Sequence, residues 1–151
     1  MRPPLLVFGW GNPSRGDDAL GPLFVERIEA MNLPGVECLT DFQLQVEHAL
    51  DLHGRRRILF VDASVAAAAP FVAAPIEAAR DESFSTHAMT PQAVLQVYCD
   101  LEDDDPPPCW LLAIRGESFE LGEAPGAAAL RNLDAALAWA TQWLATSTAV
   151  D

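Results

Sequence analysis

The stretch that decides the fold is PLLVFGWGNPSRGDDALG, residues 4–21. Its continuously apolar run ends at Gly9, a pattern that is typical of a strand buried in a parallel sheet. A loop with further glycines follows, and apolar residues then recur at helical spacing as far as Met31. Two adjacent acids, Asp17 and Asp18, stand where this helix should begin, a place where carboxylates interact favourably with free backbone N–H groups. Strand, loop and helix in this order predict the first unit of an α/β fold.

The rest of the chain continues the alternation of strands and helices. Strands are predicted over residues 36–40, 58–61, 71–76 and 109–114, and helices over 44–52, 91–101 and 127–144. Pro75 indicates that the 71–76 strand lies at an edge of the sheet. In the 44–52 helix we expect Val46, Ala49 and Leu50 to face the core. The pattern predicts a single domain over residues 1–151, an α/β three-layer sandwich with a mainly parallel, twisted sheet of about five strands and helices on both faces.

Composition bounds the class of protein. A chain of 151 residues, 50% of them hydrophobic, is long enough to bury a core of its own. No apolar run is long enough to span a bilayer, and the one near the N-terminus is too short for a signal peptide, so we expect a cytoplasmic protein with no membrane contact. The three cysteines, Cys38, Cys99 and Cys109, form no CxxC pair and are expected to be reduced core residues rather than nucleophiles or disulfides.

The net charge of −13 disfavours polyanionic partners, so we expect no nucleic acid ligand. All nine basic residues are arginines, and without a lysine the chain has no Schiff-base chemistry and no P-loop. The triple arginine at 55–57 is expected to be a solvated entry to the following strand. We expect no organic cofactor.

The opening loop does not fit a dinucleotide. The fingerprint G-x-G-x-x-G requires a glycine where this chain has Ser14, and Pro13 lacks an N–H group that a phosphate would need. Asp17 and Asp18 would repel a pyrophosphate from the start of the helix. Carboxylates that face a cation explain the loop better.

Three polar residues are expected to meet beyond the carboxyl ends of the strands, where ligands bind in such sheets. Asp18 follows the first strand, Asp62 ends the third, and His87 lies in the loop before the 91–101 helix. Asp41, at the end of the second strand, is expected nearby. Two carboxylates and one imidazole suit a borderline divalent metal such as zinc, nickel or iron, with coordination positions left open.

Each of these residues also has a structural interpretation. Asp17 is the better candidate of its pair for capping the helix, Asp62 could accept backbone N–H bonds in a turn, and His87 could be a solvated loop residue. His48, His53 and Trp10 are expected to be structural or packing residues.

Five segments in the same order along the chain resemble one known family. They are GWGNPSRGDDALG (9–21), DFQLQVEHALDL (41–52), ILFVDAS (58–64), STHAMTPQAVL (85–95) and LLAIRGESFELGEAP (111–125). Together they resemble the endopeptidases that mature the large subunit of nickel–iron hydrogenases. The first two segments look closest to the branch that serves NAD-reducing bidirectional hydrogenases.

The resemblance implies a peptidase that removes the C-terminal extension of a hydrogenase large-subunit precursor. Carried over from the family, Asp18, Asp62 and His87 are expected to contact nickel, which belongs to the precursor. Asp18 stands where other members have glutamate, so its arm is shorter. Asp18 and Asp62 are expected to be catalytic by positioning or deprotonating a water. Gly11, Asn12 and Asp41 are expected to contact the substrate.

Two other functions are compatible with parts of the pattern. A peptidyl-tRNA hydrolase-like esterase also begins with a strand and a G-x-G-N-P loop, but its loop continues into a basic, histidine-bearing stretch that is replaced here by SRGDDALG. The strong negative charge also disfavours a tRNA ligand. A non-catalytic, metal-dependent chaperone of the precursor would need the same three ligands, so the sequence leaves it open.

Overall fold

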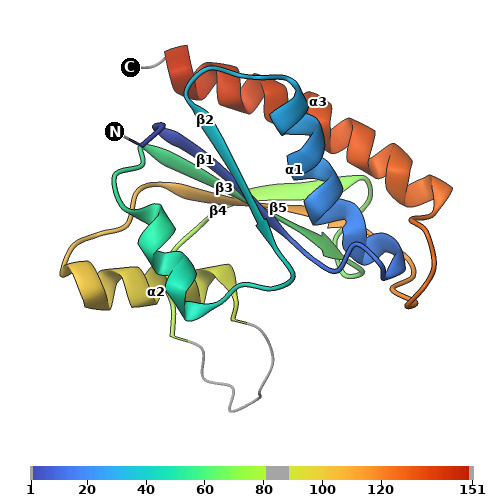
Figure 1. Ribbon diagram of the computed structural model, residues 1–151, viewed down its shortest axis with the longest axis horizontal. Coiled ribbons are helices and arrows are strands. Elements are labelled where there is room, and N and C mark those ends of the chain that lie inside the picture. The colour runs from blue at the N-terminus through green and yellow to red at the C-terminus, as the bar shows by residue number, and fades with distance from the viewer. Residues whose placement is uncertain (1, 81–88, 150–151) are drawn as a thin grey trace.

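A computed structural model describes residues 2–80 and 89–149, with only the backbone described over 147–149 (Figure 1). Its elements in chain order are β1 (Leu5–Trp10), the 3₁₀ helix η1 (Gly16–Ala19), α1 (Leu20–Ala30), β2 (Val36–Asp41), the 3₁₀ helix η2 (Val46–Leu52), β3 (Arg57–Ser64), β4 (Phe71–Ile76), α2 (Pro91–Glu102), β5 (Cys109–Arg115) and α3 (Ala127–Ala149). None of the helices in these ranges has the length and apolar character needed to cross a bilayer.

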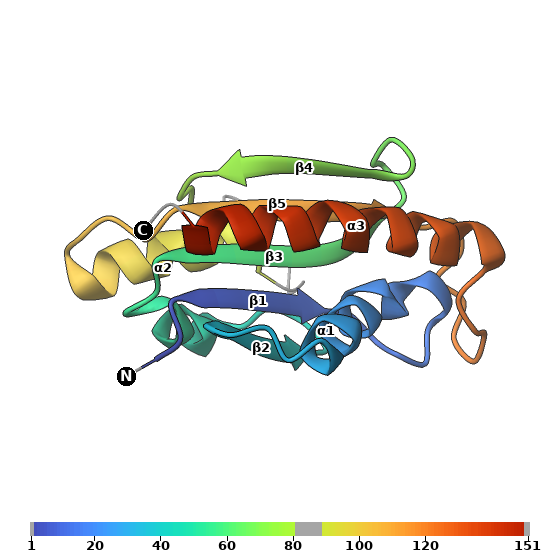
Figure 2. The ribbon, with the colours of Figure 1, turned by 90° about the horizontal axis from the view of Figure 1, so that it is seen from above.

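The described strands form one sheet in the order β2-β1-β3-β5-β4, which Figure 2 shows from above. β1, β2, β3 and β5 run parallel, whereas β4 pairs antiparallel with β5 and forms an edge, with Pro75 in it. The α1 and α3 helices lie on one face and α2 and η2 on the other (Figure 1). The predicted α/β sandwich with a mainly parallel sheet is confirmed.

Side chains alternate across the strands and build a separate core on each face. Val7 and Leu59 pack in the core under α1 and α3, whereas Phe8 and Phe60 pack in the core under η2 and α2. Asp62 lies two residues after Phe60 in the same strand, so its side chain points to the η2 and α2 face. Trp10 is 8% exposed in the same core, as expected for a packing residue.

The α1 helix touches the end of β1 backbone to backbone. A Cβ atom on Gly9 would lie 2.5 Å from the carbonyl oxygen of Gly21. A Cβ atom on Gly21 would in turn overlap the carbonyl oxygen of Trp10. These two glycines therefore bring strand and helix closer than any side chain would permit.

The η2 segment differs from the predicted helix. Val46 and Leu50 are 55% and 56% exposed, and the buried apolar side chains of this region are Leu44, Ala49 and Leu52. A 3₁₀ helix has about three residues per turn. Leu50 is therefore aligned with Glu47 on the outer side, and the prediction that Val46 and Leu50 face the core is wrong.

Arg55 and the end of α3 also differ from the prediction. The Arg55 side chain is only 2% exposed, because it pairs with Glu37 and donates to the carbonyl oxygens of Asp51 and Pro3. It is therefore not solvated. The α3 helix continues beyond the predicted residue 144 as far as Ala149.

Candidate active site

Asp62 is a partly buried carboxylate near the carboxyl end of β3. Its pKa is raised to about 7, chiefly by burial and to a smaller extent by the negative charge of Asp18, against a hydrogen bond with the backbone of Ala63 that lowers it. The groups that set this pKa include no cation. Asp62 is therefore a carboxyl group that can hold or release a proton near neutral pH.

Asp18 is held in place by the backbone of the first loop. Its Oδ2 accepts a hydrogen bond of 2.9 Å from the N–H of Asn12, and its own N–H donates to the carbonyl oxygen of Arg15 at 3.0 Å. The Asn12 side chain closes the loop by accepting from the N–H of Ser14. Asp18 thus has a fixed direction, and its negative charge adds to the effect of burial on the pKa of Asp62.

Gly11 makes this geometry possible. It adopts a φ of +147°, and a Cβ atom there would overlap the carbonyl oxygen of Asp18 and lie 3.2 Å from its Oδ1. The N–H of Gly11 donates to the carbonyl oxygen of Asp41 at 3.1 Å, so it ties the ends of β1 and β2 together. A contact of Gly11 or Asn12 with substrate stays a prediction.

Asp41 lies at the end of β2 and is bound to His48. Its Oδ2 lies 3.1 Å from Nε2 of His48, and its Oδ1 accepts from the N–H of Phe42 at 2.7 Å. His48 Nδ1 accepts from the N–H of Gln45, so the proton of the ring is assigned to Nε2, which donates to Asp41. With both ring nitrogens in use and the ring packed against Phe8, His48 orients the Asp41 carboxylate, whose contact with substrate stays a prediction.

Asp17 is not a helix cap. Neither η1 nor α1 is capped by a side chain in the described structure. The Asp17 carboxylate, 2% exposed, instead accepts three backbone N–H bonds from residues 117, 118 and 126. Burial alone would raise its pKa, but these three bonds outweigh burial and lower it, so Asp17 is a charged structural group.

The third expected metal ligand, His87, lies outside the described residues. Within 2–80 and 89–149, no three His, Cys, Asp or Glu side chains gather as a set that could hold a metal ion. Asp18 lies beyond the end of β1 and Asp62 near the end of β3, and the charge of Asp18 contributes to the raised pKa of Asp62. That the two carboxylates bind one metal ion stays a prediction. Whether His87 joins this pair stays a prediction.

The cysteines and His53 lie away from this pair. Cys109 is buried, and burial raises the pKa of its thiol to about 12, which keeps it protonated and unreactive. Cys38 has a pKa raised to about 11, by burial first and then by Glu29 and Glu37. His53 is exposed beside Glu102.

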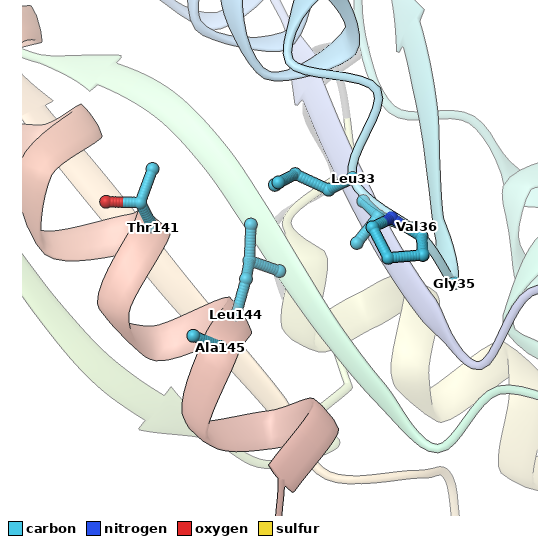
Figure 3. A pocket seen from close by; sticks show the side chains of 7 residues that line it. Leu33, Gly35, Val36, Thr141, Leu144 and Ala145 are labelled. Atoms are coloured by element: carbon cyan, nitrogen blue, oxygen red, sulfur yellow. The ribbon is translucent and has the colours of Figure 1, made fainter.

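An apolar cavity of about 420 Å³ lies at the opposite end of the sheet (Figure 3). It is lined by the segment before β2 and the last turns of α3, including Leu33, Val36 and Leu144. Because β2 begins at Val36 and ends at Asp41, this cavity is separated from the carboxylate pair by the length of a strand.

Several solved structures are similar to this chain over almost its full length. The hydrogenase maturating endopeptidase HybD from E. coli has a TM-score of 0.74 and 24% sequence identity, and the similarity covers 97% of this chain and 94% of that chain. The NiFe hydrogenase maturation protease HycI from Thermococcus kodakarensis has a TM-score of 0.73 and 22% identity, covering 93% and 92%. The chain has the fold of the hydrogenase maturation endopeptidases.

A third structure with this fold, the hydrogenase 2 maturation peptidase from a Thaumarchaeota archaeon, has a TM-score of 0.67 and 20% identity, covering 95% of this chain and 98% of that chain. No family model and no curated protein sequence matches the chain. The maturation-endopeptidase fold is therefore recognised through structure and through the short ordered motifs.

Sequence reasoning missed the use of the 116–126 segment next to Asp17. Residues 111–125 carry part of the family resemblance, but the resemblance assigns no role to any residue of the 116–126 segment. Its glycines and its proline predict a loop, while nothing in the local sequence indicates which side chain would bind its N–H groups. A partner about 100 residues away is visible only in the folded chain.

Proposed function

We propose that this chain is an endopeptidase that removes the C-terminal extension from the large-subunit precursor of a nickel–iron hydrogenase. The observation that carries the proposal is the fold of the hydrogenase maturation endopeptidases, with Asp62 near the carboxyl end of β3 and its pKa raised to about 7 by burial first and by the charge of Asp18 last. One carboxylate is fixed by the backbone and the other titrates near neutral pH.

The nickel of this proposal belongs to the substrate. Asp18 and Asp62 offer oxygen donors, and His87 is the expected nitrogen donor, a mixed set that suits a borderline divalent metal. Three ligands leave positions open for groups of the precursor. A precursor without nickel would lack the cation that two adjacent carboxylates attract, so cleavage becomes conditional on the metal.

Asp62 is the proposed general base. In its charged form it takes a proton from a water molecule while the water oxygen bonds to the scissile carbonyl carbon. The C–N bond then breaks, and the proton passes from Asp62 to the leaving amine. A carboxyl group with a pKa of about 7 is suited to both transfers near neutral pH. Asp18 supplies carboxylate oxygens to the cation.

The test is cleavage of a nickel-loaded precursor, followed by intact-mass measurement. We expect the wild-type chain to remove a short C-terminal peptide, and to leave the nickel-free precursor intact. Asp62→Asn and His87→Ala should each slow the cleavage by about a hundredfold or more. Asp134→Asn, which makes the same change at an exposed residue of α3, is the matched control and should cleave at the wild-type rate.

Each other outcome has a definite meaning. A precursor that binds in a nickel-dependent way but keeps its mass would make the chain a chaperone and overturn the peptidase proposal. Release of free tRNA and peptide from peptidyl-tRNA, without any effect on the precursor, would favour the esterase. Cleavage at the normal rate by Asp62→Asn would overturn the assignment of the base.

We further propose that the precursor is that of an NAD-reducing bidirectional hydrogenase. The support is the resemblance of two segments, GNPSRGDDALGP (11–22) and DFQLQVEHALDL (41–52), to the branch that serves these hydrogenases. Offered this precursor and that of a membrane-bound hydrogenase, the chain should process the first at least tenfold faster. Equal rates would contradict the choice of branch but not the peptidase activity.

A further inference from the structure

Two loops at the carboxyl end of the sheet are joined along their backbones. One is the first loop with η1, residues 12–19, and the other connects β5 to α3, residues 116–126. Three backbone hydrogen bonds link them: Asp17 N–H to Ser118 O at 2.8 Å, Gly16 N–H to Glu123 O at 3.0 Å, and Gly122 N–H to Ser14 O at 2.7 Å. Arg15 adds a bond from Nε to the carbonyl oxygen of Phe119 at 2.9 Å.

The centre of this junction is the carboxylate of Asp17. Its Oδ2 accepts from the N–H groups of Glu117 at 2.7 Å and Ser118 at 3.2 Å, and its Oδ1 accepts from the N–H of Gly126 at 2.8 Å. The bonds reach both ends of the 116–126 loop. One buried side chain therefore holds the loop where it leaves β5 and where it enters α3.

The two loops also leave no room for adjustment. A Cβ atom on Gly16 would lie 2.5 Å from the carbonyl oxygen of Ser118, and one on Gly116 would lie 3.0 Å from Cβ of Asp17. Such distances are shorter than ordinary van der Waals contacts. The backbones therefore touch, and the position of one loop determines the position of the other.

Asp18 is the next residue of the same turn. The bonds of Asp17 hold η1 to the 116–126 loop, while the N–H of Asn12 donates to the Asp18 carboxylate. A shift of the turn away from the 116–126 loop would carry Asp18 with it, because the two residues share one peptide plane.

We propose that Asp17 is a positioning residue, whose carboxylate ties the 116–126 loop to the first turn and thereby keeps the Asp18 carboxylate in its place on the N–H of Asn12. The effect of Asp17 on cleavage rests on the proposed function. The positioning of Asp18 does not, and it is measured separately.

Asparagine is the sharpest substitution at this position. Its side chain has nearly the same shape, but one of the two oxygens becomes an NH₂ group, which cannot accept from an N–H. Whichever way the amide is turned, a donor faces at least one of the three backbone donors. Asp17→Asn therefore removes bonds without creating a large cavity.

The first experiment is amide NMR and hydrogen exchange on the full chain. In Asp17→Asn the amides of Glu117, Ser118 and Gly126 should exchange about tenfold faster or more. The amide proton of Asn12 should move upfield, because its bond to Asp18 weakens when the turn moves. Asp104→Asn is the control, since Asp104 also accepts a backbone N–H bond but in the exposed turn after α2, and it should change none of these signals.

The second experiment separates kcat from KM for cleavage of the nickel-loaded precursor, at a temperature where every variant is folded. Asp17→Asn should lower kcat about tenfold or more, with KM changed less than threefold, since a misdirected catalytic group slows chemistry. Gly126→Pro removes one donor of the three and should have a smaller effect of the same kind. Gly126→Ala keeps the N–H, and its new Cβ would lie 3.8 Å from Asp17 Oδ1, so it should behave as wild type.

The proposal is overturned if the Asn12 signal and kcat both stay at their wild-type values in a folded Asp17→Asn protein. It is also overturned if only the Glu117, Ser118 and Gly126 amides change, because Asp17 would then hold the loop without positioning Asp18. If the wild-type chain cleaves no precursor, the proposed function fails, while the Asn12 signal still decides the positioning of Asp18. If Asp17→Asn does not fold, the Asn12 amide signal and kcat are compared between Gly126→Pro and Gly126→Ala instead. Wild-type values of both in a folded Gly126→Pro protein would overturn the proposal.

Discussion

The two ends of the sheet differ in whether a buried charged group has a partner of opposite charge. At the amino end, the Arg55 guanidinium is almost fully buried, and it is matched by Glu37 and by two carbonyl oxygens. At the carboxyl end, Asp62 is partly buried without a cation among the groups that set its pKa, and burial first and the charge of Asp18 last raise that pKa to about 7. One end neutralises its charge inside the chain, and the other leaves two like charges together.

This difference separates structure from function. A partner and hydrogen bonds offset the cost of burying an ion, whereas a carboxylate near another carboxylate has no such compensation. Perturbed pKa values of this kind cluster at functional sites. The proposed function accordingly places the cation of the precursor at the carboxyl end of the sheet.

The largest effect is expected from a glycine-to-alanine substitution at the carboxyl end of the sheet, compared with the same substitution at the amino end. Gly11→Ala would push a Cβ atom into the Asp18 backbone at a φ of +147°, and should destabilise the protein by at least about 3 kcal/mol or prevent folding. Gly54→Ala also has a positive φ, +78°, but nothing lies within 4 Å of its Cβ, so a loss of only about 1 kcal/mol is expected. Urea unfolding of both variants measures the contrast, and equal losses would show that the carboxyl end is not tightly packed.

The pH dependence of cleavage is expected to be the next largest effect. The proposed base must be charged, and the pKa of Asp62 is raised to about 7. At pH 5 only about one molecule in a hundred would carry the charge, so kcat/KM should be roughly a hundredfold lower at pH 5 than at pH 8. A profile that is flat between these values would exclude Asp62 as the base, provided that nickel-loaded precursor and folded enzyme persist at both.

The smallest effects are opposite changes in stability at pH 8. Glu37→Gln leaves the Arg55 charge buried without its partner and should destabilise by roughly 2 kcal/mol. Asp62→Asn removes a buried charge and should stabilise by on the order of 2 kcal/mol. Thermal or urea unfolding measures both, and a loss of stability in Asp62→Asn would show that its charge is compensated after all.

The sign of the Asp62 effect follows from linkage. Its folded pKa of about 7 lies above the ordinary value of 3.8, so between these two values the folded state holds a proton that the unfolded state has released. Wild-type stability from this group is therefore fully present below pH 3.8 and is lost as the pH rises towards 7. The Asp62→Asn protein does not lose stability through this group as the pH rises. The free energies of unfolding of the wild-type and Asp62→Asn proteins should therefore converge at low pH.

Much of the fold could be predicted because its signals are local. The apolar runs at β1 and β3, the proline at the start of α2 and the proline of edge strand β4 each indicate an element from a few neighbouring residues. The buried face of the short η2 segment could not be predicted in this way. The apolar residues at 46 and 50 have the spacing of an α-helix, and only the 3₁₀ geometry turns Leu50 outward.

Topology alone predicts that Asp18 and Asp62 lie at the same end of the sheet. Asp18 lies beyond the end of β1 and Asp62 near the end of β3, and these neighbouring strands run parallel. The role of Asp17 could not be found in this way. An acid at a helix start is compatible with capping and with loop anchoring, and only the arrangement of the distant 116–126 loop distinguishes them.

The direct contact of Gly9 with Gly21 has a consequence for how this region can vary. The connection between β1 and α1 begins and ends where the backbones of these two elements touch. The distance that the connection spans is therefore fixed. An insertion or deletion of one residue between Gly9 and Gly21 would change the conformation of the turn, and the position of Asp18 relative to Asp62 would change with it. Insertions that surface loops elsewhere tolerate should therefore be rejected here, even when the protein still folds.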